Sequence, residues 1–443
     1  MKSSELDAFF ECAGPQRSGT VISVDGVSAT IAGLGGAARL GDCLIIETSK
    51  GPSARVSVTQ ANDDHVGVSA FSTLTGIAPG DRALLDKAGQ VARPCEAWIG
   101  QVIDPFGYGL GGGTLVQGDK ARKIDASPPS ANLRKSLGPR LPSGLCAFDT
   151  FLPIARGQRL GIFAGPGVGK STLLNDLAQG IEADIVIVAM IGERSREVGD
   201  IIHNKFRPEL MKRAIVFVST ADQAPMAKKL GAYLAMTTAE HFRDQNKNVL
   251  LVFDSLTRFA EAHREVALSA GEPPTLHGFP PSAFRELARL VERAGPGLSG
   301  TGDITALFSV LVEGADIETA PAADTIRGIL DGHIVLERKI AERGRFPAVD
   351  ILRSVSRSLP DSASRSQNEL LAEARRVLSL YEDSEIVIRA GLYEKGTDPA
   401  TDRAIALWPS LDSYLSARSS DGIDDCFDQL RNILQTDEQA VSG

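Results

Sequence analysis

Aromatic residues are scarce in this chain of 443 residues, where they make up only 5% of the sequence. Positively charged residues are also fewer than negatively charged ones. The chain has 47 lysines and arginines and 56 aspartates and glutamates, which gives a net charge of −9. Proteins that bind nucleic acid usually carry a basic domain or stripe, so this balance argues against that class. A membrane-spanning helix needs about 20 apolar residues, and no apolar run in the sequence is that long. The first residues also lack the apolar region typical of a secretory signal.

Cysteine is rare as well, and the five cysteines show no spacing typical of a metal site: Cys12, Cys43, Cys95, Cys146 and Cys426. Their odd number fits a reduced, cytoplasmic protein without a disulfide framework. One local exception to the acidic balance is residues 119–140, with six cations against two carboxylates. We interpret this stretch as a solvated linker or as a surface that faces an acidic neighbour.

A glycine-rich loop at residues 164–172 is the most informative stretch. It follows the apolar run 160–163 and precedes apolar residues at helical spacing, so the pattern reads strand, loop, helix. This is the context of a phosphate-binding loop, in which glycines let backbone N–H groups surround an anion at a helix N-terminus. We expect Lys170 to reach the β- and γ-phosphates and the Ser171 hydroxyl to bind Mg²⁺. The expected nucleotide-binding residues are Gly165, Pro166, Gly167, Val168, Gly169, Lys170, Ser171 and Thr172.

The pattern along the chain predicts four segments. Residues 1–18 contain a short amphipathic helix with Leu6, Phe9 and Phe10 on one face, which docks on its own chain or on a partner. Residues 19–90 predict a small β-barrel from short runs separated by turns: 20–24, 27–32, 42–48, 55–59 and 66–70. Phe71 is the one aromatic residue among these 72, which is too few for a base-stacking platform, so we expect a structural or oligomerising collar.

Residues 91–364 predict an α/β domain with a parallel sheet. Its strands are expected at the apolar, β-branched runs 160–163, 185–189, 215–218, 249–253, 305–312 and 334–336. The glycine cluster 109–113 is interpreted as a loop. From residue 365 to 443 the strand signal fades, and residues such as Leu371, Ala374 and Leu378 keep the spacing of a helical C-terminal domain.

Two carboxylates follow buried strands and are candidates for the chemistry. Asp254 ends the run 249–253, where it is expected to be the partner of the phosphate loop and to hold Mg²⁺ through water beside Ser171. Glu193 follows the run 185–190 and could orient water for attack on the γ-phosphate. From spacing alone, Glu193 and Arg194 could equally form a surface ion pair.

With these motifs, the chain resembles the type III export ATPases, and within them the flagellar export ATPases. These enzymes are related to the catalytic subunits of rotary ATP synthases. The resemblance covers about residues 19–415 and is carried by segments 156–165, 191–198, 242–245, 254–260, 278–282, 311–314, 327–334 and 354–357. It implies a RecA-like ATPase core between the barrel and the helical domain. Residues 221–225 and 361–367 depart from the pattern of the relatives.

The resemblance also implies roles for single residues. Glu193 matches the catalytic carboxylate, and Arg194 lies close to the γ-phosphate. Phe346 matches an aromatic residue that stacks on adenine. Arg357 matches an arginine finger that enters the site of a neighbouring subunit. With Glu193 and Arg357 in one chain, the resemblance implies a homo-hexameric ring that uses ATP and Mg²⁺.

The partners implied are a stator-like regulator at the N-terminal helix, a central stalk protein, membrane proteins of the export gate, and export chaperones with their substrates, but no nucleic acid. The implied location is the cytoplasm, at the inner-membrane export apparatus. We therefore expect ATP hydrolysis that powers flagellar protein export. The alternatives are an injectisome ATPase, a rotary synthase subunit, a hexameric RNA translocase and a nucleotide-binding scaffold without activity.

Overall fold

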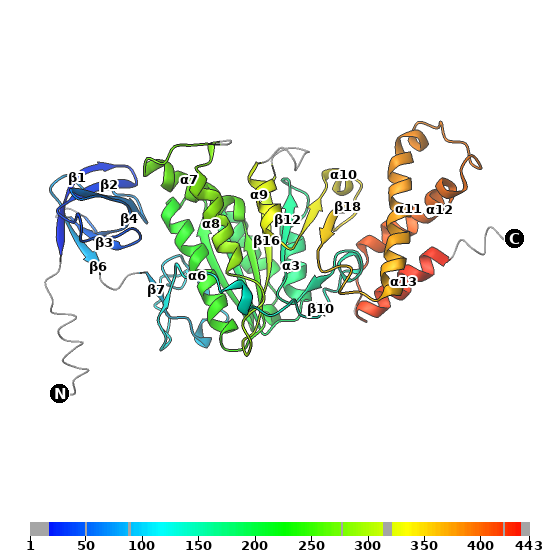
Figure 1. The fold of residues 1–443 in the computed structure, drawn as a ribbon, viewed down its shortest axis with the longest axis horizontal. Coiled ribbons are helices and arrows are strands. Elements are labelled where there is room, and N and C mark those ends of the chain that lie inside the picture. The colour runs from blue at the N-terminus through cyan, green and yellow to red at the C-terminus, as the bar shows by residue number, and fades with distance from the viewer. Residues whose placement is uncertain are drawn as a thin grey trace.

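The computed structural model describes residues 17–48, 51–86, 90–275, 278–312, 321–419 and 421–435. Figure 1 shows three parts in a row: a β-barrel at one end, a sheet covered by helices in the middle, and a group of helices at the other end. The expected N-terminal helix with Leu6, Phe9 and Phe10 lies outside the described residues. Within the described residues, no helix combines the length and the apolar character needed to cross a membrane.

The N-terminal part is a closed barrel in which the strands follow the order β1-β2-β5-β4-β3-β6. Its strands are β1 (Ser18–Asp25), β2 (Ser28–Ala32), β3 (Cys43–Glu47), β4 (Ala54–Ala61), β5 (His65–Ala70) and β6 (Arg82–Asp86). Alternate side chains such as Ile31, Leu44 and Val56 fill the interior. The barrel expected from the sequence is confirmed, and β6, which the sequence reading did not find, closes it by pairing with β1 and β3.

The central part is an eight-stranded sheet with the order β18-β17-β12-β16-β15-β13-β14-β8. All neighbours are parallel except β17 and β18. The strands are β8 (Val102–Ile103), β12 (Arg159–Ala164), β13 (Ile185–Glu193), β14 (Ala214–Thr220), β15 (Val249–Asp254), β16 (Ile304–Leu311), β17 (Gly332–Leu336) and β18 (Val349–Ser356). The six expected strands are all present, and the α/β fold class is confirmed.

Helices cover both faces of this sheet because its buried strands are apolar on both sides. The helices of this part are α3 (Lys170–Gly180), α4 (Ser195–Asp200), α5 (Pro208–Met211), α6 (Pro225–Arg243), α7 (Leu256–Ser269), α8 (Pro281–Glu292), α9 (Pro321–Ile329) and α10 (Arg338–Glu342), with the π-helix η3 (Ile201–Lys205). Along β13, Ile185 and Ile187 join one core with α6, α7, α8 and α9, whereas Val186 and Val188 join the other core with α3.

The C-terminal part contains α11 (Arg365–Arg389), α12 (Pro399–Ser416) and α13 (Ile423–Gln435). Helix α11 begins at a capping box, in which Ser364 and Gln367 satisfy each other's backbone N–H groups. Leu371 and Val377 pack into the same core as α3, together with the short helix α2 (Cys146–Asp149). The expected helical C-terminal domain is thereby confirmed as part of the fold.

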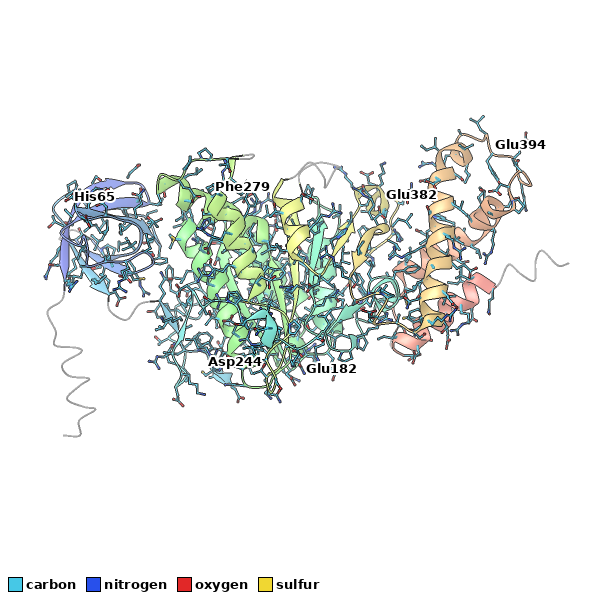
Figure 2. The ribbon with its side chains drawn as sticks, viewed as in Figure 1. His65, Glu182, Asp244, Phe279, Glu382 and Glu394 are labelled. Atoms are coloured by element: carbon cyan, nitrogen blue, oxygen red, sulfur yellow. The ribbon has the colours of Figure 1, made fainter. Side chains whose placement is uncertain are left out.

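Short elements connect the barrel to the sheet: β7 (Val91–Ala92), η1 (Glu96–Trp98), β9 (Arg122–Lys123), η2 (Ala131–Leu133), β10 (Arg140–Leu141) and β11 (Ile154–Ala155). The basic stretch 119–140 lies on acidic and carbonyl groups of the central part. Arg122 pairs with Asp244 at 2.7 Å, and Lys135 pairs with Asp303 at 2.8 Å. Asp244 lies at the end of α6 (Figure 2). The stretch therefore faces an acidic neighbour, which is one of its two expected interpretations.

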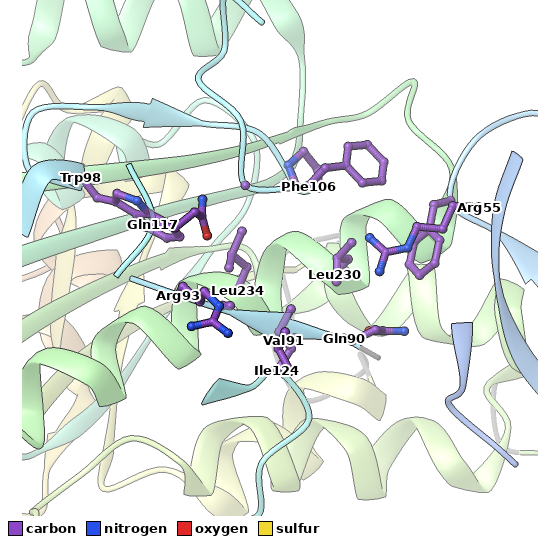
Figure 3. Close-up of a pocket in the computed structure, with 14 residues that line it drawn as sticks. Arg55, Gln90, Val91, Arg93, Trp98, Phe106, Gln117, Ile124, Leu230 and Leu234 are labelled. Carbon is purple, nitrogen blue, oxygen red and sulfur yellow. The ribbon is translucent and has the colours of Figure 1, made fainter. Parts of the chain in front are cut away.

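A cavity of about 70 Å³ lies where the barrel meets the central part (Figure 3). Arg55 and Phe71 approach it from the barrel, and Phe106 and Leu230 approach it from the central part. The rings of Phe71 and Phe106 meet edge to face at 6.3 Å. Aromatic rings therefore meet at this junction beside arginine and glutamine side chains, and none of the residues that line the cavity belongs to the glycine-rich loop.

Candidate active site

The glycine-rich loop connects β12 to α3 in the way the sequence predicts. Gly167 and Gly169 have φ angles of 79° and 89°, a region that side-chain-bearing residues rarely adopt. Gly169 is the N-cap residue of α3, and its carbonyl accepts a hydrogen bond from the backbone N–H of Leu173 at 3.0 Å. The N-terminus of an 11-residue helix therefore points at the loop and favours a bound anion there.

Lys170, Asp254 and Glu193 meet at the carboxyl ends of three strands of the sheet. The Lys170 ammonium contacts the Asp254 carboxylate and lies 3.6 Å from a Glu193 carboxylate oxygen. All three side chains are nearly buried, with exposed fractions of 11%, 7% and 13% for Lys170, Asp254 and Glu193. The pairing of β13 with β15 causes this meeting, because it sets Asp254 opposite Met190, three residues before Glu193.

Glu193 has an unusual acidity for a glutamate. Burial, together with the nearby negative charge of Asp254, raises the pKa of Glu193 to about 7, although Lys170 acts in the opposite direction. A hydrogen bond with Glu197 raises the pKa of Glu193 further. A carboxyl group with a pKa near neutrality can hold or release a proton under ordinary conditions, which suits a general acid or base.

Ser171 and Asp254 line one small cavity of about 30 Å³ beside α3. A hydroxyl and a carboxylate are oxygen ligands of the kind that Mg²⁺ prefers. The glycine-rich loop, the lysine and the helix N-terminus together suit a bound triphosphate, and Ser171 and Asp254 supply oxygen atoms beside them. Ser309 was missed by the sequence reading, and its hydroxyl donates a hydrogen bond to Asp254. The signal that could have found it is a polar residue within the apolar run 305–312.

Phe346 lies against the glycine-rich loop. A methyl group placed on Gly169 would come 3.3 Å from the Phe346 ring, so the ring and the loop backbone are close. About half of the Phe346 side chain, 52%, remains exposed. An exposed aromatic face next to a phosphate-binding loop is suited to stack on a flat base.

Arg194 and Arg357 are not brought to this cluster. Arg194 follows Glu193 directly, but its side chain is 81% exposed and pairs with Glu197 at 3.4 Å. Arg357 is exposed and follows β18, and its backbone N–H donates to the carbonyl of Asp331 at 3.0 Å. Asp331 also binds Arg159 at the first residue of β12.

Arg357 therefore lies at the end of the sheet opposite to the loop. The six residues of β12 separate the two ends, which corresponds to about 20 Å at about 3.3 Å per residue. An arginine side chain is too short to cross that distance. The side chain of Arg357 therefore does not reach the glycine-rich loop of its own chain.

Residues 221–225 form the turn between β14 and α6. The backbone N–H of Ala221 donates to the carbonyl of Glu193 at 2.9 Å, and Pro225 is the first residue of α6. The turn thus supports the backbone at Glu193, and its side chains make no contact with Lys170 or Asp254 among the hydrogen bonds and ion pairs of the described residues.

Comparisons with known proteins agree with this architecture. Residues 144–356 match the model of the ATP synthase alpha/beta family, nucleotide-binding domain, and residues 363–432 match that of the EscN-type C-terminal domain of type III secretion ATPases. A flagellum-specific ATP synthase of Caulobacter vibrioides is 45% identical over 83% of this chain and 84% of its own length.

Two solved structures are similar over 94% of this chain and the whole of theirs, at 34% identity. One is the assembled ATPase EscN of the enteropathogenic E. coli type III secretion system, with a TM-score of 0.86. The other is EscN in complex with its central stalk EscO, with a TM-score of 0.84. With the loop, the paired carboxylates and the three-part fold in place, these matches show that the chain belongs to the family of flagellum-specific ATP synthases, within the type III secretion ATPases.

Proposed function

We propose that this chain hydrolyses ATP with Mg²⁺ and that the hydrolysis drives the export of flagellar proteins through a type III secretion apparatus. The observation that carries the proposal is the buried group of Lys170, Asp254 and Glu193 at the end of the glycine-rich loop. The flagellar assignment is supported by sequence identity, because the identity to the flagellum-specific relative is 45% and the identity to EscN is 34%.

In the proposed mechanism, Lys170 exchanges its contact with Asp254 for the β- and γ-phosphates. The loop N–H groups and the N-terminus of α3 surround the phosphates, and Phe346 stacks on adenine. Ser171 and Asp254 would hold the Mg²⁺ ion, which would supply positive charge to the phosphates. Glu193 orients the attacking water and accepts its proton.

Arg357 is proposed to act on the site of a neighbouring copy, which requires a ring, and we propose a homo-hexamer. The support is the distance between Arg357 and the loop of its own chain, together with the assembled state of EscN. Arg194 is proposed to turn towards the γ-phosphate from its exposed position. An arginine finger typically contributes about 10³–10⁵ in rate.

Further partners follow from the same proposal. A central stalk protein is supported by the EscN–EscO complex. A stator-like regulator at the N-terminal segment, the membrane proteins of the export gate, and chaperones with their substrates complete the set. The chain would then work in the cytoplasm, at the membrane-bound export apparatus. The EscN structures favour an injectisome ATPase as the second candidate.

The variant Glu193→Gln tests the proposed reaction. We expect ATP to bind with an affinity close to that of the wild type, while turnover falls by about 10²–10⁴-fold because no carboxylate remains to accept the proton. Binding of a fluorescent ATP analogue and release of phosphate measure the two effects. Normal hydrolysis by this variant would show that Glu193 does not orient the water. A deletion strain that stays motile while another secretion system fails would favour the second candidate.

A further inference from the structure

Segment 343–347 joins α10 to β18 and carries Phe346. One side of the segment lies on the glycine-rich loop, because the Phe346 ring approaches Gly169. The other side carries two arginines, Arg343 and Arg345, that face the C-terminal helices. The segment that carries the ring we assign to adenine therefore lies between the loop and the helical domain.

Each arginine pairs with a carboxylate of a different C-terminal helix. Arg345 Nε lies 3.3 Å from a carboxylate oxygen of Asp412 on α12. The same guanidinium donates from Nη2 to the carbonyl of Val349 at 2.8 Å, which fixes the turn after Phe346. Arg343 forms an ion pair with Glu385 on α11. Two independent links therefore connect the segment to both helices.

The two carboxylates are held in place by a pair of aromatic rings. Tyr381 precedes Glu385 by one helical turn on α11, and Trp408 precedes Asp412 by one turn on α12, so each pair lies on one helix face. The Tyr381 and Trp408 rings are stacked, with centroids 4.4 Å apart and planes 19° from parallel. Stacking thereby sets the spacing at which the helices present Glu385 and Asp412.

Arg345 is shielded from water, whereas the side chain of Arg343 is 39% exposed. Arg345 is 9% exposed, and burial lowers its pKa although Asp412 counteracts this. A cavity of about 160 Å³ lies between α10 and the C-terminal helices, next to both ion pairs. Glu382, which lines it, lies on the side of α11 that faces α10 (Figure 2). An unpaired charge on buried Arg345 is unfavourable, so loss of Asp412 should displace the segment, and loss of Glu385 should remove its second link.

We propose that Asp412 and Glu385 are positioning residues for the adenine site, because through Arg345 and Arg343 they keep Phe346 against the phosphate-binding loop. The inference rests on the proposed function, in which Phe346 stacks on adenine. It adds two residues of the helical domain, far from the phosphates in sequence, to the determinants of nucleotide affinity.

The test compares a ligand that has a base with one that has none. For Asp412→Asn and Glu385→Gln we expect the affinity for ATP to fall by about three- to tenfold, while the affinity for inorganic tripolyphosphate stays unchanged. Calorimetric titration of the full chain measures both. Equal losses for ATP and tripolyphosphate would mean a general structural fault and would overturn the inference.

Two controls make the result specific. Glu373→Gln breaks the 2.7 Å ion pair with Arg403, which also links α11 to α12 but does not touch segment 343–347, so ATP affinity should not change. In a Phe346→Leu background, Asp412→Asn should cause no further loss, because both changes act on the same ring. Additive losses would contradict the inference. Failure of the wild type to bind ATP would defeat the proposed function, whereas unchanged ATP binding by Asp412→Asn would defeat the inference alone.

Discussion

At the scale of single residues, Glu193 shows how burial close to other charged side chains changes the acidity of a glutamate. Its neighbour Arg194 is solvated, whereas Glu193 is enclosed beside Asp254 and Lys170. Two carboxylates with one lysine between them cannot both carry full charge at low cost. Glu193 therefore binds its proton more tightly than an exposed glutamate, and burial together with the charge of Asp254 raises its pKa to about 7.

The raised pKa of Glu193 predicts a dependence of stability on pH. A carboxyl that binds its proton more tightly in the folded chain lowers stability as the pH rises from the unfolded pKa, near 4.5, through the folded value of about 7. Glu193→Gln, which mimics the protonated form, should therefore raise the melting temperature at pH 8 and have little effect at pH 4.5. Thermal unfolding without nucleotide measures this, and an equal effect at both values would contradict it.

At the scale of elements, a buried ion pair joins α6 to the end of α8. Arg293 is fully buried, and its guanidinium donates to both carboxylate oxygens of Glu240 at 2.9 and 2.7 Å. It also donates to Thr237 and to the carbonyl of Ile124. The pair therefore ties the segment around Ile124, between the barrel and the sheet, to the helices α6 and α8.

Removal of one partner of this pair should be costly. We expect Arg293→Met to lower the free energy of unfolding by about 3–5 kcal/mol, because Glu240 is left buried and unpaired. The exposed pair of Arg338 and Glu342 is the matched control, and Arg338→Met should cost less than about 1 kcal/mol. Urea unfolding measures both variants. Similar costs for the two would show that the buried pair contributes no more than a surface one.

The same scale shows how far the sequence reading extends. Six strands of the sheet were predicted because long apolar runs must be buried on both faces. Strand β6 was missed because its five residues begin and end with a charge, and β8 because it has two residues. Strand β18 was missed because exposed Arg353 and Val355 interrupt its apolar pattern at the sheet edge.

The candidate site follows the same logic. Lys170, Asp254 and Glu193 were predictable because each stands at a strand end in a recognisable pattern, and the structure brings them together, although their roles stay predictions. The contacts of Ser309, Arg345 and Asp412 depend on tertiary packing between segments more than 50 residues apart. A polar residue within an apolar run marks Ser309 as unusual, but no local pattern identifies the partner of any of these three residues.

At the scale of the whole molecule, the opposite positions of Arg357 and the glycine-rich loop predict a dependence on assembly. Arg357→Ala should bind ATP normally and form rings, yet turn over about 10³–10⁵-fold more slowly. Analytical ultracentrifugation and phosphate release measure assembly and rate in the same sample. If turnover of Arg357→Ala still rose with assembly as in the wild type, Arg357 would not be the finger.

The placement of Arg357 also has a genetic consequence. A copy without Arg357 keeps an intact phosphate-binding loop but withholds the finger from its neighbour, whereas a Lys170→Ala copy loses its own loop but still supplies a finger. Mixing the two defective chains should therefore regenerate some working sites and restore part of the turnover that neither has alone. Expressed beside the wild type, either allele should be dominant, since each defective copy enters a shared ring.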